Sequence, residues 1–174
     1  MPDTSNLKFV VESLLFSSEK PLTLNRIKDI IGDNVSPTQV KECIDELNDT
    51  YKTNRHSFAI NEVAGGFQIR TNPEYHPYLV KLHESRNDGI LSNAALETLS
   101  IISYKQPIMR AEIDSIRGVD SSAIIRGLME KKLVRIAGRG ESLGRPILYG
   151  TTNNFLELLG LSSIKDLPKI EEVK

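Results

Sequence analysis

The chain has 174 residues, 39% of them hydrophobic, and carries 22 Lys and Arg against 23 Asp and Glu. Its length fits one medium domain or two small ones, and its nearly balanced charge gives no global attraction to nucleic acid. Because no apolar run approaches the roughly 18 residues of a membrane span, no secretory signal opens the sequence and Cys43 is the lone cysteine, we expect a reduced, cytoplasmic protein with no membrane segment.

Three helices are predicted in the first 53 residues. Apolar residues recur at helical spacing in 7–16 and again in 21–32, where Thr23 is a candidate N-cap and Gly32 a stop. The third helix covers 37–53, because Ser36 and Gln39 form a capping box and Pro37 suits the first helical position.

A β-hairpin and a further helix are predicted next. Two β-type runs within 58–71 meet at Gly65-Gly66, which is a hairpin signature. Three helices followed by a hairpin is the order of a winged helix-turn-helix. Residues 73–85 have a helical apolar pattern, and the polar residues after them predict a linker at 86–91.

The second half repeats the first, which decides the predicted fold. The run PIMRAEIDSIRG matches PLTLNRIKDIIG at a constant offset of 86 residues. Helices at 93–104 and 121–132 flank or follow it, then strands within 133–139 and 145–152, and a last helix at 153–160 for which Thr152 is the candidate N-cap. The predicted class is α+β, mainly helical, with two tandem winged helix-turn-helix domains, each of three helices plus a β-hairpin wing. Their predicted bounds are 1–85 and 92–168, with a tail at 169–174.

The segment AGRGESLGRPILYGTT (137–152) is not a phosphate-binding loop. Neither GxxxxGK[ST] nor GxGxxG fits its glycines, and it lies between two strands and not at a strand-to-helix turn. It is predicted to form the second wing. No nucleophile–base pairing and no metal-ligand spacing occurs elsewhere. We therefore expect no catalytic, cofactor or metal site, and no enzymatic activity.

Charge separates the two halves as candidate DNA-binding modules. The third helix of the first half has a net charge of −2 and would be repelled by phosphate. Residues 126–145 carry six Lys and Arg against two Glu, a surplus that supports salt-sensitive contact but lacks the polar cluster of base readout. A winged-helix DNA-binding transcriptional regulator is therefore the alternative function, and direct contact with DNA is expected to be weak or indirect at most.

Surplus apolar surface favours protein partners. Phe9 and Phe16 share a face of the first helix opposite its buried stripe. Leaving both rings in water forgoes about 1.5–3 kcal/mol each. Either the second domain or a second copy of the chain could cover them. Because the link between the domains is short and polar and symmetric dimers are common, we expect a homodimer interface formed by the first domain.

The second half resembles the family of segregation and condensation protein ScpB, a kite-type subunit of bacterial SMC–kleisin complexes. The phrases AALETL, YKQPI, EID-IRGV, GRPILYGTT and FLELLGL-S---LP carry the resemblance, with SLLFSSEKPL and AGGFQIRT in the first half, so it covers about residues 7–168. Two departures are Met109, where the family has a small polar residue, typically Thr, and a short tail after the LP motif.

The resemblance implies a non-enzymatic homodimer that joins through its N-terminal domain. It implies binding to the central region of the kleisin ScpA, contact with the SMC ATPase only through ScpA, and a nucleoid-associated role in chromosome condensation and segregation. For kleisin contacts we expect an apolar groove near the first helix and wing of the second domain, with two arginines beside it. The candidate residues are Leu96, Leu99, Arg139, Arg145, Ile147, Leu148 and Tyr149. Whether the arginines serve a partner protein, DNA or neither stays open.

Overall fold

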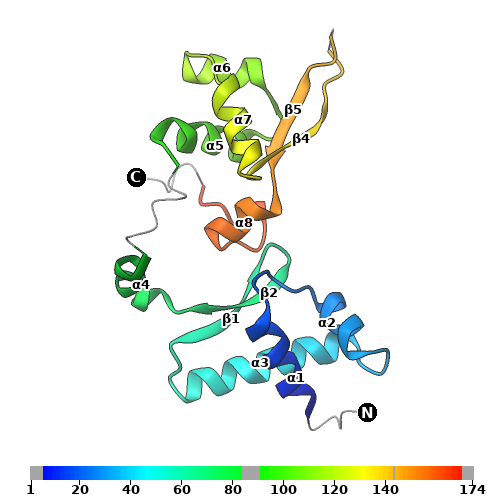
Figure 1. The fold of residues 1–174 in the computed structure, drawn as a ribbon. Coiled ribbons are helices and arrows are strands. Elements are labelled where there is room, and N and C mark those ends of the chain that lie inside the picture. Colours follow the sequence, from blue (N-terminus) through cyan, green and yellow to red (C-terminus); the bar gives the residue numbers. More distant parts are fainter. Residues whose placement is uncertain (1–5, 84–90, 143, 170–174) are drawn as a thin grey trace. The chain divides into compact units, whose positions relative to one another are not determined.

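The computed structural model describes residues 6–83, 91–142 and 144–169. These divide into two compact units, unit 1 within Met1–Arg86 and Gly160–Lys174 and unit 2 within Asn87–Leu159. The architecture is α+β and mainly helical (Figure 1). The predicted linker falls almost entirely outside the described residues, as does all of the predicted tail beyond residue 169.

Unit 1 has the predicted element order. Its elements are α1 (Leu7–Ser17), α2 (Leu24–Ile31), α3 (Pro37–Thr53), β1 (Phe58–Val63), β2 (Gly66–Thr71), the 3-10 turn η2 (Pro73–Tyr75), α4 (His76–His83) and the 3-10 turn η3 (Ile164–Asp166). The predicted caps form: Thr23 accepts from Arg26 N–H at 3.2 Å, and Ser36 and Gln39 exchange two hydrogen bonds. Helix α3 therefore begins where the sequence indicated.

The core of unit 1 lies between the three helices and the hairpin. Val11 of α1, Ile27 of α2 and Val40 of α3 are fully buried there. The Asn48 side chain makes two hydrogen bonds with the backbone of Ile60, at 2.8 and 2.9 Å, and so fixes β1 against α3. Apolar burial supplies the driving force, and this polar clamp sets the position of the hairpin.

Unit 2 repeats this order. Its elements are α5 (Asn93–Lys105), β3 (Ile108–Met109), α6 (Arg110–Arg117), α7 (Ser122–Glu130), β4 (Val134–Arg139), β5 (Ile147–Thr151) and α8 (Asn153–Leu159). Its antiparallel sheet has the order β3-β5-β4, with an irregularity between Ile136 and Gly138. Thr152 accepts from Phe155 N–H at 3.3 Å and caps α8 as expected.

The offset of 86 residues appears in the backbone as well as in the sequence. Helices α2 and α6 begin and end 86 residues apart. Leu22 forms an isolated antiparallel bridge with Phe67, and Ile108, 86 residues after Leu22, pairs with Tyr149 of β5. The segment before the second helix of each unit thus pairs with the second strand of the hairpin.

The predicted second domain runs to residue 168, whereas the structure groups residues from Gly160 onward with unit 1. The reason is hydrogen bonding to the β1–β2 hairpin. The Ala64 N–H donates to the Leu161 carbonyl at 2.9 Å, and the Ser162 hydroxyl donates to the Glu62 carbonyl at 2.9 Å. Sequence patterns do not reveal such contacts, because the paired residues are about a hundred positions apart.

A chain that ends at Leu159 should lose stability in unit 1 alone. Two hydrogen bonds disappear, so the free energy of unfolding of unit 1 should fall by about 1–3 kcal/mol. Hydrogen exchange measures this at the Ala64 amide, which should be protected in the full chain and exchange much faster in the shortened one. Unit 2 amides are the internal control, and equal protection of Ala64 in both chains would contradict the assignment.

Candidate functional site

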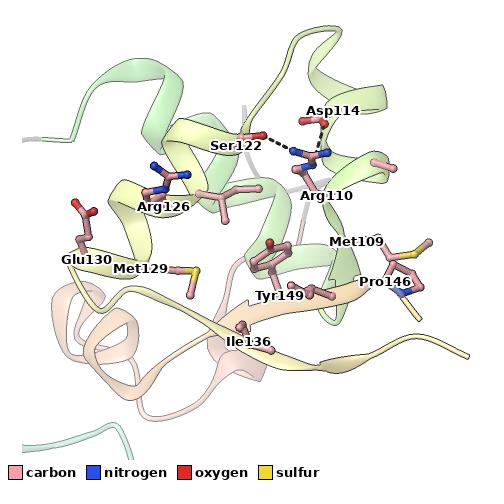
Figure 2. A pocket seen from close by; sticks show the side chains of 13 residues that line it. Met109, Arg110, Asp114, Ser122, Arg126, Met129, Glu130, Ile136, Pro146 and Tyr149 are labelled. Carbon is pink, nitrogen blue, oxygen red and sulfur yellow. Dashed lines mark hydrogen bonds and ion pairs between the residues drawn. The ribbon is translucent and has the colours of Figure 1, made fainter. Parts of the chain in front are cut away.

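Unit 2 contains an open groove of about 930 Å³ between α6, α7 and the β4–β5 hairpin. Figure 2 shows its lining side chains converging from these elements. The groove is lined by Met109, Arg110, Ala111, Asp114, Ser122, Ile125, Arg126, Met129, Glu130, Ile136, Pro146, Ile147 and Tyr149.

The floor of the groove is apolar. Ile125 and Met129 lie one helical turn apart on α7, so both face the same side. On the sheet, Ile136 of β4 pairs with Tyr149 of the central strand β5. Ile136 is 51% exposed, although the residue type favours burial. An apolar floor left open to water is a surface that a partner can cover.

The rim of the groove carries both charges. Arg126 and Glu130 stand one turn apart on α7, and both are exposed (Figure 2). On the α6 side, Arg110 contacts the Ser122 hydroxyl and approaches Asp114 Oδ2 at 3.7 Å. This arrangement suits an amphipathic segment that lays an apolar stripe on the floor and meets charges at the edge.

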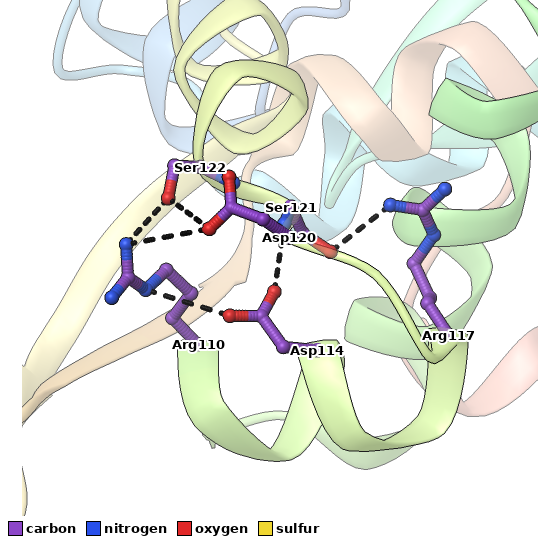
Figure 3. A network of polar contacts seen from close by, with 6 residues as sticks. All are labelled: Arg110, Asp114, Arg117, Asp120, Ser121 and Ser122. Carbon is purple, nitrogen blue, oxygen red and sulfur yellow. Dashed lines mark hydrogen bonds and ion pairs between the residues drawn. The ribbon is translucent and has the colours of Figure 1, made fainter.

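The corner between α6 and α7 beside the groove is held by a polar network (Figure 3). Asp114 Oδ1 accepts from the buried Ser121 N–H at 2.7 Å, and Arg117 donates to Ser121 Oγ at 3.0 Å and to Glu97 at 3.1 Å. Hydrogen bonds from the Ser122 hydroxyl and its N–H hold the pKa of Asp120 below its ordinary value. The sequence run EIDSIRGVDSS therefore sets the angle between two groove walls.

The start of α6 is capped without a side-chain hydroxyl at the N-cap position. Met109 offers no hydroxyl, but its N–H donates to Glu112 Oε2 at 2.9 Å, which satisfies one of the free donors of the first turn. The Met109 side chain lines the groove instead (Figure 2). Met109 thus adds apolar surface to the site.

A second polar clamp fixes β5. Gln106 Oε1 accepts from Thr151 N–H at 2.7 Å and from its hydroxyl at 3.1 Å, and Gln106 Nε2 donates to the Ser103 carbonyl at 3.2 Å. A Cβ on Gly150 would lie 2.9 Å from Gln106 Oε1 and 3.3 Å from Ala137 Cβ. The runs YKQPI and ILYGTT therefore meet in space, and glycine is needed at their junction.

We expect Gly150→Ala to destabilise unit 2 by about 1–3 kcal/mol, because the new methyl group displaces the Gln106 side chain from the buried Thr151 donor. Urea unfolding followed by circular dichroism measures this. Gly127→Ala is the matched control: nothing lies within 4 Å of a Cβ there, so it should stabilise α7 by about 0.5–1 kcal/mol. If both substitutions changed the free energy of unfolding equally, the requirement for glycine beside the Gln106–Thr151 hydrogen bonds would be excluded.

The structure places only two of the seven expected kleisin-contact residues in this groove, Ile147 and Tyr149. Leu148, between them, does not line it, and Leu96 is 48% exposed on α5, away from the lining set. Leu99 is 5% exposed and belongs to the core, since the helical period of α5 points it inward. The groove therefore lies beside the second and third helices of unit 2, and kleisin contacts beside the first helix stay a prediction.

Arg139 and Arg145 also lie outside the lining set, exposed on the hairpin. Sequence reasoning missed Met109, Arg126, Met129 and Ile136, which do line the groove. The spacing of Ile125 and Met129 was an available signal, but a helical stripe alone does not reveal whether a core or an open groove receives it.

Unit 1 carries a separate exposed apolar surface on α1. Phe9 is 58% and Phe16 is 80% exposed, whereas Leu7, Val11 and Leu15 on the opposite side are buried. The sequence period thus correctly separated the two sides of this helix. What covers the two phenylalanines remains a prediction.

Within residues 6–83, 91–142 and 144–169, no three His, Cys, Asp or Glu side chains converge as metal ligands. None of the helices in those ranges has the length and apolar content required to cross a bilayer.

Comparison with known proteins identifies the family. The family model for the segregation and condensation complex subunit ScpB matches residues 9–170. Segregation and condensation protein B of Syntrophotalea carbinolica is 43% identical over 170 residues (98% of this chain and 85% of the relative). The same protein of Alkaliphilus metalliredigens is 39% identical over 171 residues (98% and 89%).

Among solved structures, a dimer of an ScpB N-terminal domain in complex with an ScpA peptide is 32% identical, with a TM-score of 0.40 over 45% of this chain and 95% of that one. The match of the family model over nearly the whole length, together with relatives of about 40% identity, shows that this chain belongs to the ScpB family of segregation and condensation complex subunits.

Proposed function

We propose that this chain is a non-enzymatic, homodimeric subunit of a bacterial SMC–kleisin complex that binds the central region of the kleisin ScpA in chromosome condensation and segregation. The observation that carries the proposal is membership of the ScpB family over residues 9–170. In this assignment the SMC ATPase is reached through ScpA and the chain supplies binding surfaces only.

The proposal includes two tandem winged helix-turn-helix modules. Each unit has three helices followed by a hairpin, and the segment before the second helix pairs with the second hairpin strand in both. The third helix of each unit also ends alike: the Arg55 N–H donates to the Lys52 carbonyl, and the Lys132 N–H donates to the Met129 carbonyl. Repeated backbone geometry supports one module used twice.

For the kleisin contact we propose the groove of unit 2. Its apolar floor and two-sign rim fit an amphipathic kleisin segment, with Met129, Ile136 and Tyr149 as the anchoring contacts. For the dimer contact we propose the exposed face of α1, where Phe9 and Phe16 would be covered by the second copy.

The test mixes the full chain with the central fragment of the kleisin encoded in the same organism. Light scattering coupled to gel filtration should give twice the chain mass for the protein alone and a larger, stable complex after mixing. A protein that stays monomeric and does not retain the fragment would refute the proposal.

A further inference from the structure

The two hairpins of the chain repeat the same backbone arrangement but differ in charge. They also differ in whether another segment of the chain is hydrogen-bonded to the hairpin turn. The stretch that joins α3 to β1 and β2, residues 54–71, has Arg55 and Arg70 against Glu62, and Arg70 Nη1 is buried. The turn of this hairpin is also occupied, because Ala64 N–H and the Glu62 carbonyl are bonded to Leu161 and Ser162.

The corresponding stretch of unit 2 is basic and open. We name as the basic hairpin patch five exposed side chains that lie at the end of α7 and on the β4–β5 hairpin, namely Lys131, Lys132, Arg135, Arg139 and Arg145. Glu141 is the one carboxylate in residues 131–145. Figure 1 shows this hairpin extending away from the helices of unit 2.

The patch has no internal charge partner in the described part of the chain. Among the described residues of unit 2, carboxylate oxygens lie within 4.0 Å of Arg110 and Arg117. No carboxylate oxygen of the described residues lies within 4.0 Å of a side-chain nitrogen of the patch. Arg135 donates to the Thr151 carbonyl at 3.1 Å and Arg139 to the Arg145 carbonyl at 3.4 Å, which orients two guanidinium groups without neutralising them.

The patch is also separate from the groove. None of its five residues lines the groove, and the floor residue of β4, Ile136, belongs to the groove alone. A protein partner is held chiefly by aromatic, apolar and Arg anchors that surround a dry apolar centre, and Lys is depleted in such interfaces. Cations without an apolar centre, on a projecting hairpin, fit evenly spaced phosphates better than they fit a folded protein.

We propose that the basic hairpin patch binds the sugar–phosphate backbone of double-stranded DNA without reading its sequence. The chain has neither a strong overall charge nor a polar base-reading cluster on α7, so affinity comes from phosphate contacts and is strongly salt-dependent. Because none of the patch residues lines the groove, unit 2 can bind a protein segment in the groove and contact DNA through the patch at the same time.

The experiment measures binding of the full chain to a fluorescent duplex of about 20 base pairs of arbitrary sequence, by anisotropy, over a range of salt. Each phosphate contact contributes a slope of about −0.9 to log K against log salt. Five contacts give a slope of about −4.5, which is roughly a 500-fold loss of affinity between about 50 and 200 mM salt.

Two double variants that each remove two positive charges distinguish binding by the patch from attraction to the overall charge of the protein. Arg139→Gln plus Arg145→Gln should reduce the slope to about −2.7 and weaken binding at low salt about ten-fold or more. Lys52→Gln plus Arg55→Gln removes the same charge from unit 1, where Arg55 (φ 55°) has the same left-handed backbone as Lys132 (φ 58°). This control should bind as the parent chain does, and melting curves check that both variants fold.

Three results would overturn the proposal. The first is no duplex binding at about 50 mM salt, and the second is an equal loss of affinity in both variants. The third is a poly-glutamate peptide of about 20 residues that binds as tightly as the duplex, which would assign the patch to an acidic protein segment. None of these measurements includes the kleisin fragment, whose binding is tested separately, so this proposal and the proposed function can fail independently.

Discussion

The chain carrying Phe9→Asp and Phe16→Asp is expected to be a monomer at concentrations where the parent chain is a dimer. Both side chains are more than half exposed in the single chain, so the substitutions remove no core contact. In a two-fold dimer each lost ring counts twice. At about 1.5 kcal/mol or more per ring, even one lost ring per chain weakens association more than about 100-fold.

Analytical ultracentrifugation over a dilution series gives the dissociation constant of the dimer. Val119→Asp plus Leu158→Asp is the matched control, because both residues are 57% exposed and lie in unit 2. The control should stay dimeric, and both variants should keep the parent's circular dichroism. If the α1 variant remained a dimer, the interface would lie elsewhere in the molecule.

The second large effect is expected in the groove of unit 2. Met129→Glu plus Ile136→Glu places two carboxylates on an apolar floor that a bound kleisin segment would seal from water. An uncompensated charge in such a site is strongly unfavourable. We expect affinity for the central ScpA fragment to fall at least about 100-fold, which corresponds to about 3 kcal/mol.

Isothermal titration calorimetry with the kleisin fragment measures this loss. The control is Val119→Glu plus Leu158→Glu, which adds the same charge to exposed apolar residues of unit 2 outside the lining set. The groove variant should remain dimeric, so that lost binding is not a consequence of lost assembly. Unchanged affinity in the groove variant would move the kleisin contact to another surface.

Polar clamps explain why short sequence phrases identify this chain. Gln106 and Thr151 are 45 positions apart yet share hydrogen bonds, and Asp114 fixes the backbone of Ser121 across the α6–α7 corner. Asn48 performs the same task for β1 in unit 1. These residues hold elements at fixed angles, and the groove is one result of those angles.

Tyr51 shows a further contact that no local pattern predicts. Its hydroxyl donates to Glu12 at 2.7 Å, which joins α3 to α1. Burial first, and then this hydrogen bond, raise the pKa of Tyr51 well above its ordinary value. Its ring also packs against Phe58 at 5.0 Å between centroids, so one side chain ties two helices to the hairpin.

The sequence alone determined the order of elements, their caps, the repeat at 86 residues and the family. These depend on residues close together in the chain: Ser36 with Gln39, Thr152 with Phe155, and the apolar stripe of α1. Local hydrogen bonds and helical period act over a few positions, so they can be read directly. The same period also separated Phe9 and Phe16 from the buried side of their helix.

The tertiary structure alone decided which apolar residues are available to a partner. Leu99 and Met129 both belong to amphipathic helices, yet the first lies in the core and the second lines an open groove. It also decided that residues from Gly160 onward join unit 1 and that, among the described residues, no carboxylate lies within 4.0 Å of a cation of the basic hairpin patch. A periodic pattern states which side of a helix is apolar, but the element that covers that side is set by packing between residues far apart in the chain.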